Sequence, residues 1–549
     1  MKNNSIKVML IAGTLAIGIT SCKKNLILTP VDQVTSLQVF NTPAGVDAAM
    51  AKVYGAFAVS GNSGPDGTGD IAGVDGGTSD FFREFWNCEE LPTDEAVITY
   101  TDPGVQDLHN MVWDATNAIS RGLYYRSLYQ ITLCNNFLQQ TTPALLSKYG
   151  ITGAAATKIA YYDAEARFLR AYQYWVLMDV FGNPPFATDA TKIGSVIPSQ
   201  ISRKDLFNYI VGELKAIDPL MVQPNKNDYG RADEAAVWAL LARVYLNAQV
   251  YTGTADYTDA ITYAQKVIGT SGYGLISNFQ NLMLADDNLN SMPGGGPVSE
   301  FIFTINYDGA RTETYGGSQY LTHAGVGGSM PVTKFGIDGG YAGSRTTSNI
   351  VDLFPTPPTE DTTGFPSNHN VDTRAQFWYP GQSEVINSVG TFTDGLSICK
   401  FRNVSRTGVP GSNPKYPDID LPLFRVPEMY FIYAESVLRG GSGGDLATAL
   451  GYMNLIRTRA YGGSTAGNLP NTGALTLQFI LDERARELMW EGFRRTDLIR
   501  YGLFTSASYV WPFKGGAKAG TGVADFRNLF PIPSTDIADN PNLKQNPGY

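Results

Sequence analysis

The stretch LDERARELMWEGFRRTDLIRY, from Leu481 to Tyr501, contains ten charged residues among twenty-one, in a chain that is only 17% charged. When the stretch is wound as a helix at about 100° per residue, its apolar and small residues fall on one side. They are Leu481, Ala485, Leu488, Gly492 and Ile499. This pattern predicts one helix whose apolar stripe faces a core.

The charges of this stretch divide between the two sides of the predicted helix. Glu483, Glu487, Glu491 and Arg494 cluster opposite the apolar stripe, whereas Arg495 falls close to the stripe. A charge near a core needs a partner, and Glu491 is the nearest candidate at one helical turn. We therefore predict that Glu491, Arg494 and Arg495 form structural ion pairs, with Arg495 buried.

Glu487 and Glu491 could instead serve as an acid/base pair in sugar hydrolysis, because they lie one helical turn apart. Glu487 has Arg484 within reach, and Glu491 has Arg494 and Arg495. Pairing with arginine lowers a carboxyl pKa, whereas a general acid needs a raised pKa. The pattern favours structural pairing, and we predict no catalytic residue here.

Four blocks of the chain, in order, resemble the recurrent segments of the SusD/RagB family of surface glycan-binding lipoproteins. The last helical stretch, ERARELMWEGFRRTDLIRYG, is similar to the C-terminal signature of that family. The other blocks are DAEARFLRAYQYWVLMDVFGNPPF (163–186), PLFRVPEMYFIYAESVLRGG (422–441) and LFPIPSTDIADNPNLKQNPGY (529–549). The likeness spans nearly the whole chain after its first residues.

The resemblance implies a mainly α fold, with a scaffold of tetratricopeptide-like helical pairs, long loop-rich segments and a few short strands. It implies a protein that captures an oligosaccharide for a SusC-type TonB-dependent transporter and closes over the ligand as a lid. The helical-pair face of the scaffold would contact the transporter. The resemblance implies no enzyme activity and no cofactor.

The N-terminus indicates export and lipid anchoring. An apolar run of twelve residues, Val8 to Ile19, follows Lys2 and Lys7 and is too short to cross a bilayer, but it suits the core of a signal peptide. The small residues that end in Cys22 resemble a bacterial lipobox, so we predict a signal peptide over 1–21 and acylation of Cys22. The alternative is an ordinary signal peptide followed by an incidental cysteine.

An acylated Cys22 would attach the chain to the membrane through its N-terminal lipid only. With the family resemblance, this predicts a lipid-anchored protein of the outer membrane that faces the cell surface. Lys23 and Lys24 stand where surface-exported relatives often carry acidic residues, which leaves the leaflet open.

Composition excludes some functions. Loss of two lysines with the signal peptide moves the formal charge from −10 to −12, which is poorly suited to nucleic acid. Three cysteines remain beyond Cys22, an odd number that argues against a disulfide framework. The three histidines are far apart and match no metal-ligand spacing, so we predict no metal site.

Helical periodicity is concentrated in residues 107–180, 203–270 and 425–502. Within the second region, EAAVWALLARVYLNAQVY and DYTDAITYAQKVI resemble a tetratricopeptide hairpin whose alanines allow close approach. We predict one unit over 22–549, with an N-terminal helical part to about 280, a loop-rich ligand-facing part over about 281–424 and a C-terminal part from about 425.

Two loop-rich stretches, residues 60–104 and 285–415, are rich in glycine and aromatic residues. A sugar ring has an apolar C–H face and a rim of hydroxyls, so its binder needs exposed aromatic rings beside polar groups. The candidates of these types are Asp80, Arg83, Trp86, Tyr315, Gln319, Tyr320, Tyr341 and Trp378. The alternative for each aromatic is burial against the scaffold.

Two other functions stay open. The chain could bind a non-sugar nutrient such as a peptide within the same family, or it could be an envelope glycosidase of helical fold. The glycosidase requires two carboxylates with separated pKa values in a cleft, and no uncommitted pair is visible.

Overall fold

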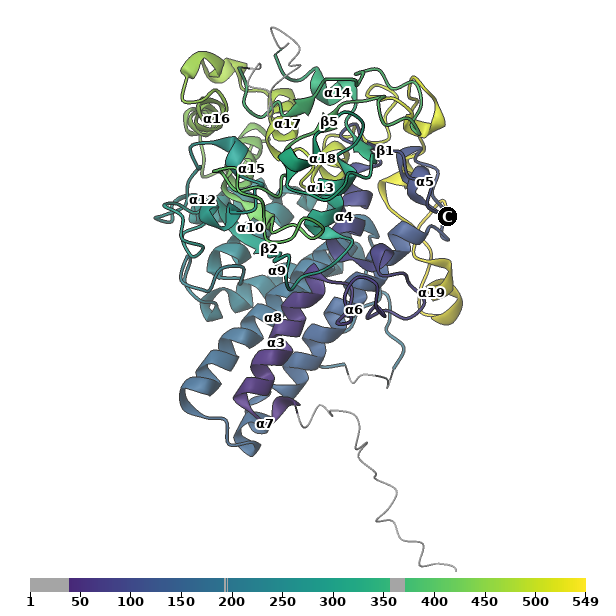
Figure 1. Cartoon of the computed structure of the whole chain (residues 1–549). Helices are drawn as coiled ribbons and strands as arrows, with labels where there is room; N and C mark the ends of the chain where they lie inside the picture. The colour runs from purple at the N-terminus through teal and green to yellow at the C-terminus, as the bar shows by residue number, and fades with distance from the viewer. Residues whose placement is uncertain (1–38, 192–193, 195, 356–370) are drawn as a thin grey trace, which may run out of the picture.

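The computed structural model describes residues 39–191, 194, 196–355 and 371–549 of the chain, and it is mainly helical (Figure 1). The helices are α3 (Pro43–Ala58), α4 (Phe81–Glu90), α5 (Val105–His109), α6 (Ala118–Gln140), α7 (Pro143–Lys148), α8 (Gly153–Val180), α9 (Arg203–Ile217), α10 (Glu234–Leu246), α11 (Ala248–Thr252), α12 (Tyr257–Ile268), α13 (Gly317–Ala324), α14 (Ser348–Val351), α15 (Val426–Leu438), α16 (Leu446–Ala460), α17 (Leu477–Leu488), α18 (Arg494–Arg500) and α19 (Ser534–Asp539). The short strands are β1 (Val97–Ile98), β2 (Phe301–Ile305), β3 (Ser344–Arg345), β4 (Phe377–Trp378), β5 (Ser397–Ile398) and β6 (Leu421–Arg425). The predicted fold class is confirmed.

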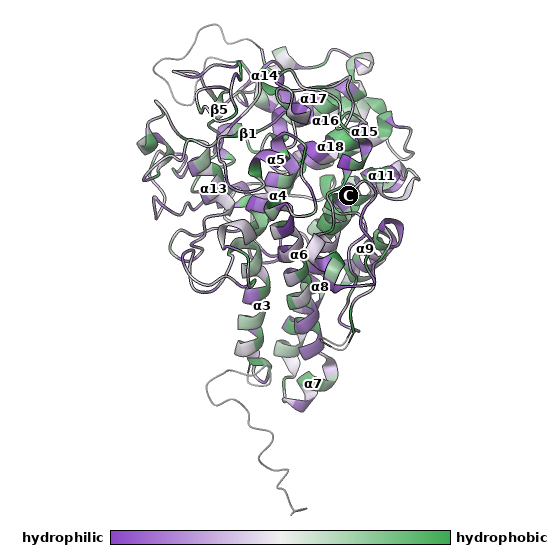
Figure 2. Ribbon diagram, turned by 90° about the vertical axis from the view of Figure 1, so that its right-hand side faces the viewer, coloured by the Kyte–Doolittle hydropathy of each residue, from purple (hydrophilic) through white to green (hydrophobic). Residues whose placement is uncertain are grey.

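The scaffold is built from helices that pack on one another in chain order. Helix α6 packs on α8 and α8 on α9, and α10 contacts α12, which in turn contacts α15 and so leads to α16. Helices α3, α6 and α8 extend together from one end of the molecule, with α7 at the tip (Figures 1 and 2). The predicted hairpin is present, because α10 and α12 meet through fully buried alanines that let the backbones approach closely. These alanines are Ala239, Ala242, Ala260 and Ala264.

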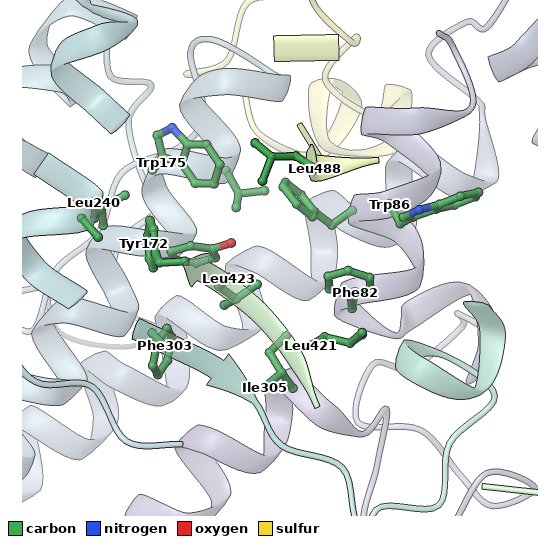
Figure 3. Close-up of a cluster of buried hydrophobic side chains, with 14 of the residues drawn as sticks. Phe82, Trp86, Tyr172, Trp175, Leu240, Phe303, Ile305, Leu421, Leu423 and Leu488 are labelled. Atoms are coloured by element: carbon green, nitrogen blue, oxygen red, sulfur yellow. The ribbon is translucent and has the colours of Figure 1, made fainter. Parts of the chain in front are cut away.

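A two-stranded antiparallel ladder lies in the core. Strand β2 pairs with β6, with Ile305 opposite Leu421. Its side chains pack with those of several helices (Figure 3). The labelled members of this cluster are Phe82, Trp86, Tyr172, Trp175, Leu240, Phe303, Ile305, Leu421, Leu423 and Leu488. One hydrophobic cluster joins buried residues from Phe40 to Leu543.

The prediction of one continuous helix over 481–501 is wrong. Helix α17 ends at Leu488 and α18 begins at Arg494, and between them Trp490 and Gly492 have φ angles of 64° and 83°. Such angles end a right-handed helix. The freed N–H groups of Trp490 and Gly492 donate to the buried carboxylates of Glu95 (2.9 Å) and Glu90 (2.6 Å), so the break is stabilised by tertiary contacts.

The stretch 60–104, predicted as loop-rich, contains helix α4. Asp80 caps this helix, because its carboxylate accepts from the N–H of Arg83 at 3.1 Å. Glycines before Asp80 hid the helix from periodicity. Helix α3 was also missed, although Thr42 caps it and Pro43 begins it.

Cys88, Cys134 and Cys399 are buried free thiols, as expected for a chain without a disulfide framework. No described helix is both long enough and apolar enough to span a bilayer. The predicted signal peptide, Cys22 and His369 lie outside the described residues.

Candidate ligand-binding surface

Pairing of β1 with β3 brings two tyrosines from distant segments together. Val97 lies opposite Arg345 and Ile98 opposite Ser344, and the ladder continues with a hydrogen bond from Thr99 N–H to Gly343 O at 3.1 Å. Tyr100 therefore follows β1 on the same edge where Tyr341 precedes β3. Gly343 allows this approach, since a Cβ there would lie 2.7 Å from the Tyr100 ring.

Helix α13 holds the Tyr341 ring in place. The buried Gln319 amide donates to the Tyr341 hydroxyl at 2.9 Å, and the His323 ring lies against the Tyr341 ring with centroids 4.9 Å apart. Tyr341 is nevertheless 43% exposed. Its ring is thus both accessible and restrained.

A second aromatic group lies beside Tyr341. The Tyr315 hydroxyl donates to Asp66 at 2.9 Å and accepts from Lys415 at 3.1 Å, and the Lys415 ammonium lies 5.1 Å from the Tyr315 ring centroid. Burial raises the pKa of Tyr341, as do the nearby charges of Asp338 and Tyr315, whereas Lys415 lowers it. Tyr315 is connected to Tyr341 through α13, which begins just after Tyr315 and carries Gln319.

We call the set Tyr100, Tyr315, Gln319, Tyr341 and Lys415 the Tyr341 surface. It combines exposed or half-exposed phenol rings with an amide, an ammonium group and neighbouring carboxylates. Rings supply a flat apolar face, and the polar groups supply donors and acceptors around it. Such a surface suits a ligand that has an apolar face and hydroxyl groups at its rim.

Arg83 and Asp80 hold the segment that carries Tyr315 and the start of α13 in position. The Arg83 guanidinium lies 4.7 Å from the Tyr320 ring centroid, and its Nη1 contacts the carbonyl of Tyr315 at 3.5 Å. The Asp80 carboxylate accepts from Thr314 Oγ1 (2.8 Å) and from Gly317 N–H (3.1 Å), so it joins the start of α13 to the start of α4.

Burial rules out four predicted residues as direct contacts. Asp80, Trp86, Gln319 and Tyr320 are 0%, 0%, 2% and 3% exposed. Trp86 packs edge-on against both Tyr320 and Trp490, and the Tyr320 hydroxyl donates to Asn87 at 2.8 Å. Asp80 and Trp86 serve the core because α4 is a buried helix and not a loop, and Tyr320 is buried on α13 against Trp86.

Trp378 belongs to a different part of the loop-rich region. It lies on β4, and it is half-buried against a small apolar cluster that includes Val326, Phe335 and Cys399. Its indole N–H lies 3.1 Å from Ser329 Oγ and 3.0 Å from the Pro380 carbonyl. The structure brings Arg83, Tyr315, Gln319 and Tyr341 together, and contact of Arg83, Tyr315 and Tyr341 with a ligand stays a prediction.

The chain was compared with known proteins. A model of the SusD family matches residues 299–549. The starch-binding protein SusD of Bacteroides thetaiotaomicron is 36% identical to the chain over 586 aligned residues, which cover 100% of both proteins. The chain belongs to the SusD family.

Other similar proteins agree with this membership. The SusD-like protein P38 of Formosa agariphila is 25% identical over 416 residues, which cover 71% of this chain and 75% of that protein. Among solved structures, surface glycan-binding protein A of Bacteroides thetaiotaomicron in complex with laminarihexaose has a TM-score of 0.66 and 21% identity, over 92% of this chain and 99% of that one. At this identity the likeness shows the shared fold alone.

The charged signature segment of this SusD-family chain is buried in an ion network. Glu487 accepts hydrogen bonds from Arg425 (2.6 Å), Arg459 (2.5 Å) and Arg374 (3.2 Å). Burial alone would raise the pKa of Glu487, but these three guanidinium groups outweigh burial and hold the pKa far below its usual range. The pKa of Glu491 is lowered in the same way by Arg425 and Lys400. Neither carboxyl has the raised pKa that a general acid needs.

The partners of the signature arginines differ from those predicted. Arg495 is fully buried, as expected, but it pairs with Glu89 (3.0 Å) and Asp179 (2.9 Å) and not with Glu491. Arg494 is also buried and pairs with Asp94 at 2.7 Å. The acidic side chains expected opposite the core, Glu483, Glu487 and Glu491, are also buried. They are buried because other segments of the chain bring arginines against α17.

Sequence reasoning missed Tyr100 and Lys415 as members of the Tyr341 surface. Tyr100 follows a short apolar run, and Lys415 lies in the turn-rich segment GSNPKYPD. Neither has a local signal, because only the β1–β3 pairing and the packing of the Tyr315 loop bring them together.

Proposed function

We propose that this SusD-family protein binds a glycan through the Tyr341 surface. The observation that carries the proposal is the restrained, exposed Tyr341 ring surrounded by polar groups. The name of the 36% identical relative, a starch-binding protein, supports it, as does a bound laminarihexaose in a protein of the same fold. Sugar rings would stack on Tyr341, with Tyr100 and Tyr315 alongside, and their hydroxyls would contact Lys415, while the buried Gln319 holds the Tyr341 ring in position.

The protein would work by capture and not by turnover. Binding would concentrate an oligosaccharide at a SusC-type TonB-dependent transporter, over which the protein would close as a lid. The helical-pair face would contact the transporter, and acylated Cys22 would hold the chain at the outer membrane, facing the cell surface. Support for the anchor is the apolar run that ends in small residues before Cys22.

One set of binding experiments tests the capture function. Residues 23–549 are titrated by calorimetry with maltohexaose, laminarihexaose and a panel of other oligosaccharides, and the products are analysed in parallel. Saturable binding without hydrolysis supports the proposal. Hydrolysis contradicts it in favour of a glycosidase, and failure of every glycan contradicts it in favour of a non-sugar ligand such as a peptide.

The anchor and the partner need separate tests. Mass spectrometry of the native protein should find two or more acyl chains on Cys22, and an unmodified Cys22 would disprove the anchor. Detergent extracts should yield a complex with a TonB-dependent transporter, and a protein isolated alone after mild cross-linking would disprove the partnership.

A further inference from the structure

A cavity of about 370 Å³ lies apart from the Tyr341 surface, between α3, α8, β2 and the turn at residues 229–231. Helices α3 and α8 pack together in the lower half of Figure 1, with β2 above them. Its size falls in the range of small-ligand sites, about 300–1,000 Å³. The lining side chains used below are Asp47, Ala51, Tyr54, Gly55, Tyr162, Tyr229, Arg231, Asn306 and Thr312.

Three tyrosines line the cavity, and the hydroxyl of each one donates to a different carboxylate. The pairs are Tyr54 with Glu165 (2.5 Å), Tyr162 with Asp47 (2.9 Å) and Tyr229 with Asp420 (2.6 Å). These bonds join segments far apart in the chain, so the rings are held before any ligand arrives. A preformed aromatic lining avoids the entropy cost of ordering side chains on binding.

The charges around the cavity are compensated. Arg231 donates through Nε and Nη2 to Glu165 at 3.0 and 2.6 Å, while its guanidinium lies 4.3 Å from the Tyr162 ring centroid. Asp47 pairs with Lys158 at 2.8 Å. Because no charge among the described residues of its lining is uncompensated, the cavity disfavours an ionic ligand and suits a neutral one.

Polar groups remain beside the aromatic lining. The half-exposed Asp47 carboxylate can accept further hydrogen bonds, and Asn306 and Thr312 reach the cavity from the segment after β2. An apolar lining with a few polar groups at its edge matches the two faces of a sugar ring. An aliphatic ligand would leave these polar groups without partners.

We propose that this cavity is a second ligand site, which takes a single neutral sugar ring, such as a monosaccharide or the end of a short oligosaccharide. The proposal rests on the proposed glycan-binding function but concerns different residues. The C–H face of the ring packs on the half-buried Tyr54, and its hydroxyls bond to Asp47, Asn306 and Thr312.

Helix α3 offers positions from which the cavity can be blocked. Gly55 lies inside the helix, where glycine costs about 1 kcal/mol relative to alanine, and a Cβ built on it meets no atom within 4 Å. Ala51, one turn earlier on the same lining, is exposed. A tryptophan at either position can enter the cavity without a backbone clash.

The test uses residues 23–549 and saturation-transfer NMR with millimolar glucose, galactose and mannose. Ala51→Trp and Gly55→Trp are the blocked variants. Gly212→Trp is the matched control, because Gly212 is an exposed glycine inside α9 whose Cβ also meets no atom within 4 Å. Tyr341→Ala reports on the other surface, and thermal melts confirm that each variant is folded.

We expect at least one sugar to bind the parent protein, with affinity reduced about tenfold or more in both blocked variants and retained in Gly212→Trp and Tyr341→Ala. If monosaccharide binding is lost in Tyr341→Ala and unchanged in the two blocked variants, the second site is overturned. The absence of signal from all three sugars also overturns it. If the monosaccharides bind in the cavity but the affinity for oligosaccharides is unchanged in Tyr341→Ala, the proposed Tyr341 surface is wrong and the second site stands.

Discussion

Replacement of Glu487 by glutamine should destabilise the fold strongly while leaving the ligand surface intact. The carboxylate of Glu487 lies among Arg374, Arg425 and Arg459, all buried, and its own exposed fraction is 0%. Removing one partner from a buried ion pair costs about 3–5 kcal/mol, because the remaining charges stay in the interior without compensation. The other carboxylates of the network compensate part of the charge, so we expect the lower half of this range.

Differential scanning calorimetry measures this loss. Unfolding entropy is about 2.1 cal mol⁻¹ K⁻¹ per residue, so roughly 500 residues melting together lose about 1 °C of Tm for each kcal/mol. We expect a fall of about 3–4 °C for Glu487→Gln by this scaling. Asp259→Asn is the control, because Asp259 pairs with Lys215 at 3.9 Å on the surface, where such pairs contribute about 0–1 kcal/mol. Equal Tm shifts in the two variants would refute the argument that burial makes the network essential.

Four further predictions concern stability. Burial raises the pKa of Glu84 from 4.5 to about 8, so the stability that the protonated Glu84 contributes is present below pH 4.5 and is lost as pH rises towards 8. Tm should fall over that pH range, and less steeply in Glu84→Gln. For Glu483 the pKa shift has the opposite sign, because arginines outweigh burial and lower its pKa to about 2. Acid titration from pH 4.5 towards 2 should therefore also lower Tm. A flat Tm from pH 2 to 8 would contradict both the Glu84 and the Glu483 prediction. Gly492→Ala should cost about 2–4 kcal/mol, because φ is 83° and the new Cβ would lie 2.6 Å from the Phe85 ring; an unchanged urea midpoint would show that the turn relaxes freely. Asp80→Ala should cost about 1–2 kcal/mol by removing the cap of α4, with Asp80→Asn milder in urea titrations; equal losses would exclude a capping role.

The scaffold could be predicted from the sequence because its helices are long, amphipathic and local. The alanine-rich hairpin of α10 and α12 was found in this way, and burial of Arg495 followed from its position next to an apolar stripe. The partners of Arg495 could not be found, since Glu89 and Asp179 come from segments more than 300 residues away. Periodicity carries no information on such contacts.

The ligand surface was predicted only in part for the same reason. Tyr341 and Gln319 lie within one segment, and residue type was enough to select them. Tyr100 joins them through a two-residue strand pairing across almost 250 positions, which no local pattern predicts. Trp86 was misplaced because the glycines before α4 indicated a loop, whereas Asp80 starts a buried helix directly after them.

Glycan binding through Tyr341 is tested most directly by calorimetry of three proteins with the best-binding hexasaccharide. The proteins are the parent chain, Tyr341→Ala and Tyr161→Ala, in which Tyr161 is a tyrosine of matching exposure, 41%, on α8. Loss of a stacking ring should cost about 1–1.5 kcal/mol, or roughly a tenfold rise in Kd, in Tyr341→Ala only. An unchanged Kd in Tyr341→Ala, or an equal rise in Tyr161→Ala, would contradict binding at the Tyr341 surface.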